Sequence, residues 1–384
     1  MKTFAKNKPS IKELLKEKPQ GKIDIVLLIF TILITVFGII MVYSASSYTG
    51  YVRYDDSFFY MKKQILGALL GAAAMTGLTF CNYKVLDRLK VPILIVSIIL
   101  LIVVFIPGVG LENYGANRWI DLPGFTIQPS EISKFAFIIF ASGYMASHQD
   151  KMTTFKGLLP VLAAGGIIAL LIILEPNMSI TMCVILLMLF MLFMGGTRLK
   201  HFIILSLPAA ALVPILIWME PYRLNRLSAF LNPWASPLEE GFQLIQSYYS
   251  LGSGGWFGVG LFNSRQKYLF LPFSESDFIF SIIGEELGLF GSLMTIAVFC
   301  VIIYRCFKVA FNAPDRLGFY MASGVGAIIA IQVAINIAVV TGSIPPTGLP
   351  LPFVSAGSSS LVVFMGGIGI VQNIARHSSK IEIN

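Results

Sequence analysis

The strongest constraint on this chain is a series of apolar stretches, each long enough to cross a lipid bilayer. A helix needs about 17–25 residues to span a hydrocarbon core of about 30 Å. The chain is 56% hydrophobic and 12% charged, with a mean hydropathy of +0.79, unlike a soluble domain. We therefore expect an all-α polytopic membrane protein. The runs predict about ten spans, over residues 23–45, 60–80, 91–107, 128–147, 157–174, 178–196, 200–218, 275–305, 317–341 and 352–375.

The first 22 residues form a basic segment ahead of the first span. A basic start followed by an apolar run, with small residues at Ser44–Ser46, resembles a secretory signal peptide. The apolar run is too long for that, so we expect an uncleaved first membrane helix. The seven lysines of this segment are Lys2, Lys6, Lys8, Lys12, Lys16, Lys18 and Lys22.

Basic residues also cluster in alternate loops, which the positive-inside rule assigns to the cytoplasm. This places both termini inside, with residues 1–22 as a cytoplasmic segment and 377–384 as a cytoplasmic tail. Residues 23–376 then form one membrane domain, in which 219–274 is a large extracytoplasmic loop between the seventh and eighth spans. The net charge of +8 is spread over these loops rather than one face, so it indicates topology and no nucleic-acid partner.

Several kinds of site are excluded by the residues present. All three histidines, His148, His201 and His377, fall at predicted cytoplasmic ends, away from the outer acids that a Ser-His-Asp site would need. The sequence contains no HExxH and no GxxxxGK[ST] motif, which argues against zinc-protease and nucleotide-hydrolysing sites. The four cysteines form no CxxC pair. The remaining candidates for catalytic or binding residues are the acidic and basic side chains of the predicted outer side.

The first outer cluster contains Arg118, Glu131 and Lys134. Pro129 and Glu131 are ordinary signals of a helix start. Lys134, one turn inside an apolar helix, needs a partner such as Glu131 or an anionic ligand. Arg118 beside Trp119 suits either an interfacial anchor or bidentate phosphate binding.

The second cluster lies between Gly252 and Gly291 and carries Arg265, Lys267 and Asp277. Ser274 and Asp277 loosely match a capping box. Asp277 also shares a helical face with Ser281, Gly284 and Gly288, which predicts either a ligand-facing wall or close packing on another helix. Glu286 lies nearly opposite Asp277 and is expected to serve structure. The Gly-rich residues 252–260 suit tight turns or close approach to a ligand.

The third cluster is the Pro- and Gly-rich segment 341–360. Its composition predicts a re-entrant or rim loop, which membrane depth tolerates only where the loop lines protein or a watery cavity. The hydroxyls of Ser355 and Ser358 could hold a sugar or phosphate, and could equally cap the last helix.

These stretches resemble a known family. Residues 115–135 (GANRWIDLPGFTIQPSEISKF), 241–272, 276–288 (SDFIFSIIGEELG) and 347–360 (TGLPLPFVSAGSSS) are similar to the signatures of the SEDS cell-wall polymerases, the FtsW, RodA and SpoVE proteins. The likeness covers the whole chain in order. Residues 313–315 and 331–337 resemble the division and sporulation branch more than RodA.

The resemblance implies a peptidoglycan glycosyltransferase that polymerises lipid II at the outer face of the bacterial cytoplasmic membrane. The growing glycan chain would stay on undecaprenyl pyrophosphate, and the strands would be crosslinked by a class B penicillin-binding protein within the division or elongation machinery. The family's essential acid falls on Asp277, and its functional Arg, Glu and Lys fall on Arg118, Glu131 and Lys134. Which growth process is served, division, sporulation or cell shape, is left open.

The implied mechanism makes Asp277 the base for the acceptor hydroxyl, because glycosyl transfer needs a proton acceptor. Positive charge from Arg118 and Lys134, with Arg265 or Lys267, would hold the departing pyrophosphate. The family suggests help from a divalent cation, Mg²⁺ or Mn²⁺, and no nucleotide.

The chain departs from the family pattern at two places. Residues 355–360 read SAGSSS where SYGGSS is common, and residues 175–180 read EPNMSI where many relatives have QPDLGT. The acid expected at Asn177 is absent, so no acidic function is carried there. Two other functions stay open: a flippase for the same lipid precursor, which broken helices and buried charge also suit, and a scaffold without catalysis.

Overall fold

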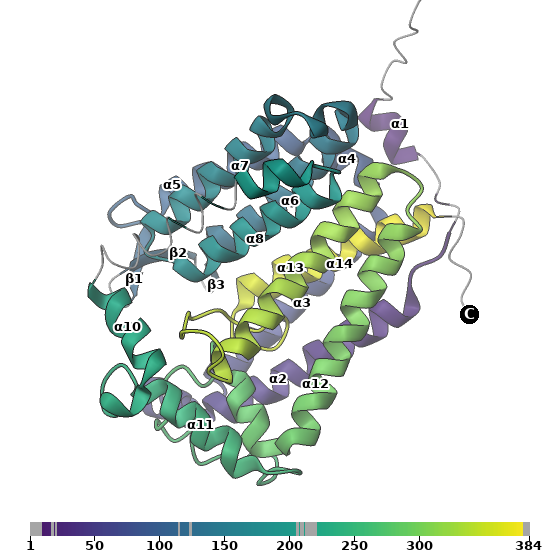
Figure 1. Ribbon diagram of the computed structural model, residues 1–384. Helices are drawn as coiled ribbons and strands as arrows, with labels where there is room; N and C mark the ends of the chain where they lie inside the picture. Colours follow the sequence, from purple (N-terminus) through teal and green to yellow (C-terminus); the bar gives the residue numbers. More distant parts are fainter. Residues whose placement is uncertain are drawn as a thin grey trace, which may run out of the picture.

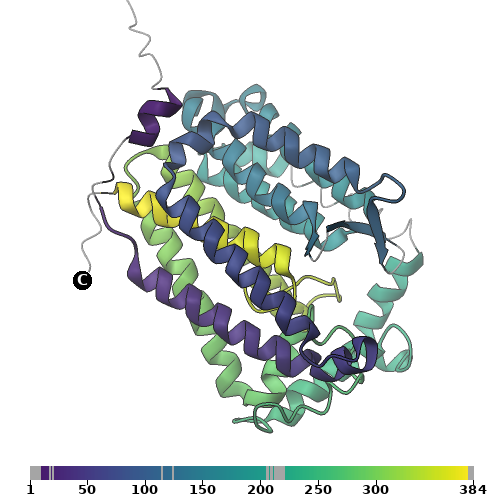
Figure 2. The ribbon, with the colours of Figure 1, turned by 180° about the vertical axis from the view of Figure 1, so that it is seen from behind.

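The computed structural model describes residues 10–16, 19, 21–113, 116–122, 125–204, 207, 211 and 221–378. Helices dominate this part of the chain and lie side by side in one bundle (Figures 1 and 2). The helices that build the bundle are α2 (Ile25–Tyr54), α3 (Phe59–Phe80), α5 (Lys90–Val103), α6 (Pro129–Ser147), α7 (Phe155–Leu174), α8 (Met178–Met194), α12 (Ile279–Phe311), α13 (Arg316–Val340) and α14 (Ser358–His377). The short helix α1 (Ile11–Lys16) precedes α2, α4 (Tyr83–Arg88) lies between α3 and α5, and the 3-10 turn η1 (Gln149–Thr153) lies between α6 and α7.

Six of these helices, α2, α3, α7, α12, α13 and α14, are long and apolar enough to cross a membrane, and α5 and α8 are shorter apolar helices. This confirms a helical membrane protein. Each predicted span from 23 to 196 and from 275 to 375 contains a helix, because uninterrupted apolar residues satisfy their backbone groups internally only as helices in lipid. The predicted seventh span, 200–218, lies largely outside the described residues. The number of spans stays a prediction.

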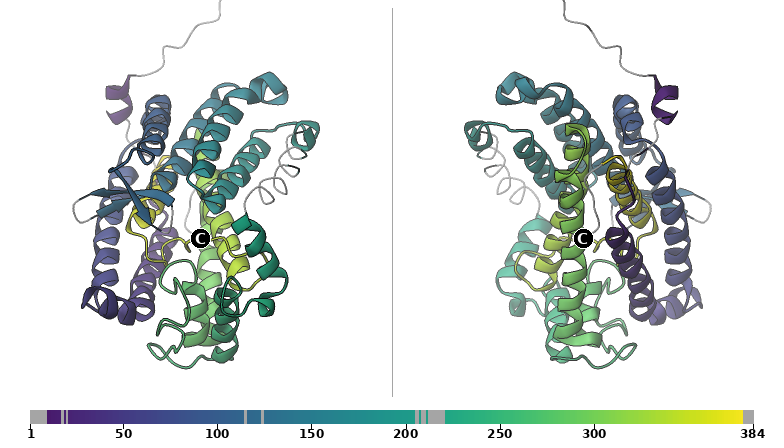
Figure 3. Two further views of the ribbon diagram at one scale, coloured as in Figure 1. Left: turned by 90° about the vertical axis from the view of Figure 1, so that its left-hand side faces the viewer. Right: turned by 90° about the vertical axis from the view of Figure 1, so that its right-hand side faces the viewer.

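Helices α13 and α14 form the centre of the bundle. Their most apolar windows are 72% and 78% buried within the protein, against 28–44% for the other spans. Figure 1 shows both between helices α6 and α8 on one side and α2 and α12 on the other, and Figure 3 shows the same bundle from its two sides. Small residues allow close contact: a Cβ on Gly67 would lie 2.8 Å from Ser358 Cα, and one on Gly369 would lie 2.5 Å from the Met75 carbonyl. Glycine interfaces of this kind let membrane helices approach closely.

Both ends of the described chain meet at one end of the bundle (Figure 1). The backbone N–H of Gly21 donates to the Arg376 carbonyl at 2.7 Å. Beside it, Asp24 forms an ion pair with Arg305 at 2.6 Å and caps α2. Two termini at the same end are what the predicted topology requires, and the side of the membrane they face stays a prediction.

A small antiparallel sheet lies between α5 and α6, in a segment where the sequence predicted only a loop. Its strands β1 (Gly110–Asn113), β2 (Ala116–Leu122) and β3 (Phe125–Ile127) are ordered β1-β2-β3. Ile120 on β2 pairs with Ile127 on β3 and is buried. Strands this short offer too few alternating residues for their pattern to stand out in an apolar sequence. The sheet is thus an addition to the predicted all-helical fold.

The predicted extracytoplasmic segment 219–274 contains helices of its own. Residues 219 and 220 lie outside the described residues. The remainder forms α10 (Pro221–Leu231), the 3-10 turn η2 (Pro233–Ala235) and α11 (Phe242–Gly254). Ser247 and Ser250 of α11 hydrogen-bond to Ser281 of α12 at 2.8 and 2.9 Å, and a Cβ on Gly254 would overlap the Gly284 carbonyl. The Ser281–Gly284 face therefore packs on a helix, which was one of the two predicted alternatives.

Helix α12 is broken at Gly288, whose φ of 69° and ψ of −167° are not helical. The Gly-rich segment 252–260 fills the break: the Val259 N–H donates to the Glu285 carbonyl at 2.9 Å, and Leu289 N–H to Gly255 O at 2.9 Å. A Cβ on Gly288 would overlap Gly258 N. In this structure the glycines serve backbone turns and close approach.

Candidate active site

Asp277 lies in a turn directly before α12. The helix begins at Ile279 with Phe278 as its N-cap and has no side-chain cap, so the predicted capping box at Ser274 is wrong. The backbone of Asp277 is held instead by Asn336 of α13, whose Nδ2 donates to Asp277 O at 2.8 Å and to Leu349 O at 2.7 Å. One amide thus ties the turn to the loop between α13 and α14.

That loop, residues 341–357, reaches the Asp277 carboxylate at Gly348. Gly348 has a φ of +65°, and a Cβ built on it would lie 3.0 Å from Asp277 Oδ2. A glycine is needed here both for the left-handed backbone and for the close approach. Ser355 closes the loop, because its Oγ accepts from Leu351 N–H at 2.7 Å and donates to the Ser276 carbonyl at 2.5 Å. Ser358 is the first residue of α14 and is partly exposed.

The pKa of Asp277 is raised to about 6. Burial is the main cause, the nearby Glu275 carboxyl adds to it, and the charges of Arg226 and Arg118 partly oppose it. Burial likewise raises the pKa of Glu275. A carboxylate with a pKa near 6 is largely ionised at neutral pH and is still a stronger base than an ordinary aspartate. These are the properties of a general base.

Two arginines supply the positive charge around Asp277. Arg118, on β2, donates from Nε to Glu175 O at 3.1 Å and from Nη2 to Pro176 O at 2.6 Å. Arg226, on α10, donates from Nη1 to Pro346 O at 3.0 Å. The structure therefore brings the predicted Arg118 together with Asp277, and adds Arg226, which sequence reasoning missed.

A pocket of about 370 Å³ lies beside this charge cluster. Its volume falls within the range of about 300–1,000 Å³ typical of small-molecule sites. Arg226 and Pro346 connect it to the loop that contacts Asp277. The pocket is lined by Arg226, Glu239, Glu240, Phe242, Gln243, Pro272, Phe273 and Pro346.

Glu131 and Lys134 lie beneath the loop 341–357, and neither side chain is exposed. Lys134 Nζ is 2.8 Å from Glu131 Oε1 and 2.7 Å from Gln332 Oε1. Gln332 in turn donates to Pro350 O at 2.9 Å, and Ser360 donates to Glu131 at 3.1 Å. The partner that Lys134 was expected to need is therefore Glu131. The pair supports the loop from inside the bundle, and direct contact with a substrate stays a prediction.

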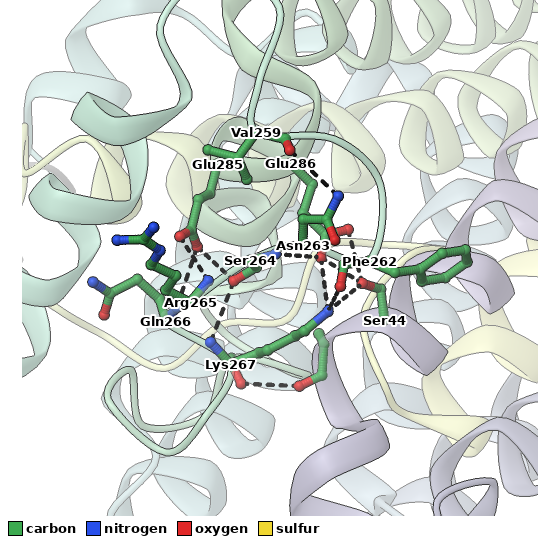
Figure 4. Close-up of polar contacts among 12 residues, drawn as sticks. Ser44, Val259, Phe262, Asn263, Ser264, Arg265, Gln266, Lys267, Glu285 and Glu286 are labelled. Atoms are coloured by element: carbon green, nitrogen blue, oxygen red, sulfur yellow. Dashed lines mark hydrogen bonds and ion pairs between the residues drawn. The ribbon is translucent and has the colours of Figure 1, made fainter.

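Lys267 belongs to a separate buried cluster, drawn in Figure 4. It is 4% exposed, and its Nζ lies 3.2 Å from Glu286 Oε1 and 2.6 Å from Phe262 O. Glu286 also accepts from Ser44 at 2.6 Å, which is consistent with the structural role expected for it. The side chain of Arg265 is exposed, while its backbone N–H donates to Glu285 at 2.9 Å. Each of these contacts belongs to the α12 break, and none joins Lys267 or Arg265 to Asp277.

In the described part of the chain, no group of three or more His, Cys, Asp or Glu residues is placed so that it could hold a metal ion. A divalent cation would need ligands from the substrate as well as from the protein. It stays a prediction, and no step below depends on it.

Proteins of one family resemble this chain over nearly its whole length. A family model described as "Cell cycle protein", FtsW/RodA/SpoVE, matches residues 24–380. The chain belongs to this family. It is 40% identical over 356 residues to stage V sporulation protein E of Bacillus subtilis, covering 92% of this chain and 97% of the relative. It is 39% identical over 362 residues to a probable peptidoglycan glycosyltransferase FtsW of Geobacter sulfurreducens, covering 94% and 97%.

Solved structures share the fold. One is titled "Structural coordination of polymerization and crosslinking by a peptidoglycan synthase complex". A chain in it is 26% identical to the protein described here and matches it with a TM-score of 0.77. The match covers 93% of this protein and 99% of that chain. The rod shape determining protein RodA of Thermus thermophilus, at 23% identity, matches with a TM-score of 0.69 over 93% and 98%. The second likeness concerns the fold alone.

Three members of the site were missed from sequence. Arg226 is one of several charges in the outer loop, and nothing in its neighbours distinguishes it. Asn336 could have been identified, because an amide side chain within an apolar span needs a hydrogen-bond partner. In the sequence it stood out only as part of residues 331–337, which resemble the division and sporulation branch. Glu175 directly follows a span, and its carboxyl is buried and has no hydrogen-bond partner in the described structure.

Proposed function

We propose that this protein is a peptidoglycan glycosyltransferase that polymerises lipid II into β-1,4-linked glycan at the outer face of the bacterial cytoplasmic membrane. The observation that carries the proposal is the turn before α12. There a half-buried carboxylate, Asp277, has a pKa raised to about 6, and the charges of Arg118 and Arg226 act on it. An acid of this kind beside two arginines suits proton abstraction next to a departing anion. The curated relatives named for this activity support it.

The reaction follows from these charges. The 4-hydroxyl oxygen of the acceptor GlcNAc attacks C1 of the donor MurNAc, and the hydroxyl proton passes to the Asp277 carboxylate. The new C1–O bond forms as the bond from C1 to the lipid pyrophosphate breaks, with inversion at C1. The bonding electron pair leaves with the pyrophosphate oxygen, whose growing negative charge Arg118 and Arg226 stabilise.

The surrounding contacts hold the base in place. Asn336 fixes the backbone of Asp277 and of Leu349, while Gly348 brings the loop against the carboxylate. Beneath the loop, the Lys134–Glu131 pair acts through Gln332 and Ser360. Accurate placement matters because a displacement of about 1 Å can cost about 100-fold in rate.

The partners proposed are lipid II, the glycan chain on undecaprenyl pyrophosphate, and a class B penicillin-binding protein that crosslinks the product. The likeness to a chain of a peptidoglycan synthase complex that coordinates polymerization with crosslinking supports the last partner. Relatives named for sporulation and for FtsW support a role in division or sporulation.

The test uses purified full-length protein in lipid vesicles, with its transpeptidase partner and labelled lipid II. We expect glycan polymer, resolved by size on a gel, from the wild-type protein and almost none from D277N. The matched control is D121N, which removes an exposed carboxylate of β2 and should polymerise normally. Movement of lipid II across the vesicle without polymer would support a flippase instead.

A further inference from the structure

Large apolar side chains are exposed beside the break in α12. Trp256 and Phe257 of the Gly-rich segment are 73% and 81% exposed, and Phe290 of α12 is 60% exposed. The ring centroids of Phe257 and Phe290 lie 6.5 Å apart. We call these three residues the aromatic patch. Single exposed apolar residues are ordinary on a protein surface, but a group of large ones usually marks a surface that is covered by a partner or a membrane.

Backbone hydrogen bonds fix the aromatic patch to α12. The Phe290 N–H donates to Trp256 O at 3.1 Å. In the opposite direction, the Val259 N–H donates to Glu285 O at 2.9 Å. These backbone groups of a non-helical segment are therefore paired within the protein. That pairing is the condition under which irregular backbone is tolerated at membrane depth.

The length of α12 sets the depth of the aromatic patch. Near the far end of this helix, Arg305 pairs with Asp24, which caps α2 just before its first apolar residues. The pair marks one edge of the apolar layer, because charge is costly further inside. Residues 289–304 carry no charge, and a helix of that length rises about 24 Å. Since the hydrocarbon core is about 30 Å thick, the patch beside Leu289 lies within its opposite edge, and a tilt of the helix would bring it deeper.

The polar and apolar residues around the break are arranged as they are in a membrane-embedded region. The charged side chains of Lys267, Glu285 and Glu286 are 4%, 2% and 0% exposed. The residues turned outward are apolar, and the segment 252–262 contains no charged residue. Charges enclosed beneath an apolar surface are typical of protein surrounded by lipid, whereas charged side chains of a water-facing surface are mostly exposed.

We infer that the aromatic patch inserts among the lipid acyl chains at the membrane face opposite the chain termini. Part of the predicted extracytoplasmic segment 219–274 is then a membrane element. The apolar window of α12 is only 33% buried within the protein, so lipid covers the rest, and the patch continues that surface. Trp is enriched where the acyl chains meet the headgroups. Figure 1 shows α11, which ends just before the patch, at the end of the bundle away from α1. The inference requires a membrane-spanning chain and does not rest on the proposed function.

The experiment measures tryptophan fluorescence of the full-length protein in vesicles of phosphatidylcholine with either brominated or ordinary acyl chains. Bromine quenches only those rings that reach the acyl chains. Trp256 is one of four tryptophans in the chain. We therefore expect the emission quenched by brominated lipid to be smaller in W256F than in wild type, by up to one quarter of the total wild-type emission. Should W256F not reconstitute, W256Y takes its place and is judged in the same way.

The matched control is W234F. Trp234 is another exposed tryptophan of the segment 219–274. Its neighbours Asn232 and Ser236 line a polar pocket together with two glutamates, which is a surface suited to water. We expect W234F to keep the full wild-type amount of lipid quenching. Iodide in the aqueous phase should show the reverse, with more quenched emission lost in W234F than in W256F.

Three results would overturn the inference. Equal lipid quenching in W256F and wild type would show that the patch does not reach the acyl chains. Lipid quenching of Trp256 that disappears when the transpeptidase partner is added would show that a helix of that partner covers the patch. Quenching that disappears as the protein-to-lipid ratio is raised would show that a second copy of this chain covers it. None of these measurements depends on catalysis, so the polymerisation assay tests the proposed function separately.

Discussion

Two charge clusters, one at the break in α12 and one at the turn before α12, differ in how fully their polar groups are hydrogen-bonded. In the Glu286 cluster (Ser44, Ser264, Lys267, Glu285 and Glu286), Glu286 accepts hydrogen bonds from Ser44 and Ser264 and pairs with Lys267. In the Asp277 site (Arg118, Glu175, Arg226, Asp277 and Asn336), both Glu175 oxygens and Asn336 Oδ1 have no hydrogen-bond partner in the described structure.

The difference separates structure from function. A network whose polar groups are all hydrogen-bonded stabilises one conformation, and a ligand could form few new hydrogen bonds with it. Unmatched buried polar atoms beside acids with raised pKa values are typical of sites that bind or react. Lys267 of the first cluster and Arg118 of the second were both predicted to hold the pyrophosphate, because a sequence gives the charges and not their partners. We therefore expect changes in the first cluster to affect stability and changes in the second to affect rate.

The largest expected effect comes from D277N. It should lower the polymerisation rate by about 10²- to 10⁴-fold, the usual contribution of a general base, while the thermal unfolding temperature stays at least as high as in wild type. The pKa of Asp277 is raised, so its ionised form costs stability at neutral pH, and a neutral amide removes that cost. Lipid II polymerisation and thermal unfolding on the same sample measure both. If D277N lost polymerisation activity only because it unfolds, the distinction between the two clusters would be wrong.

The K267M variant should act in the opposite way. It leaves the buried Glu286 carboxylate without its cation, which should destabilise the protein by about 3–5 kcal/mol. The R265Q variant is the control, because the Arg265 side chain is exposed, and it should change stability by less than about 0.5 kcal/mol. Chemical unfolding in detergent measures both. An unchanged K267M stability would show that the Glu286 cluster is not a structural unit.

The G348A variant tests the contact between the loop and the base. Its Cβ would lie 3.0 Å from Asp277 Oδ2, at a φ of +65°, so the loop or the carboxylate must shift. We expect a rate up to about 100-fold lower, because misplacement of a reacting group is costly. G357A in the same loop is the control, since its Cβ would meet only Ser360 Cβ at 3.6 Å. Equal rates for the two variants would contradict the proposed placement.

The smallest effect is a shift in pH dependence. Polymerisation should fall as the pH drops through about 6, because Asp277 becomes protonated and can no longer accept a proton. Glu275 raises this pKa, so E275Q should lower it and move the acid limb toward lower pH. At pH 5.5 the variant should keep a roughly 2- to 3-fold larger fraction of its own maximal rate than wild type. Initial rates across pH 5–8 measure this, and an unmoved limb would remove Glu275 from the electrostatics of the site.

The sequence by itself determined the membrane class and the positions of most helices, because long apolar runs can satisfy their backbone in lipid only as helices. It also indicated Arg118, Asp277 and the 341–360 loop as candidates, since charge and helix-breaking residues are unusual in such a chain. Neither the sheet around Arg118 nor the break at Gly288 was visible. The strands of the sheet are too short for their alternating pattern to stand out, and the break depends on hydrogen bonds from the separate Gly-rich segment 252–260.

Only the tertiary structure decided which charges act together. Lys134 and Lys267 looked equivalent to Arg118 as phosphate-binding cations, yet each is enclosed with its own carboxylate. Arg226 and Glu175, which had no distinguishing pattern, join the electrostatics of the Asp277 site. The physical reason is that the effect of a charge depends on its distance to other charges and on its burial. Those quantities are set by the packing of helices and loops that lie far apart in the chain.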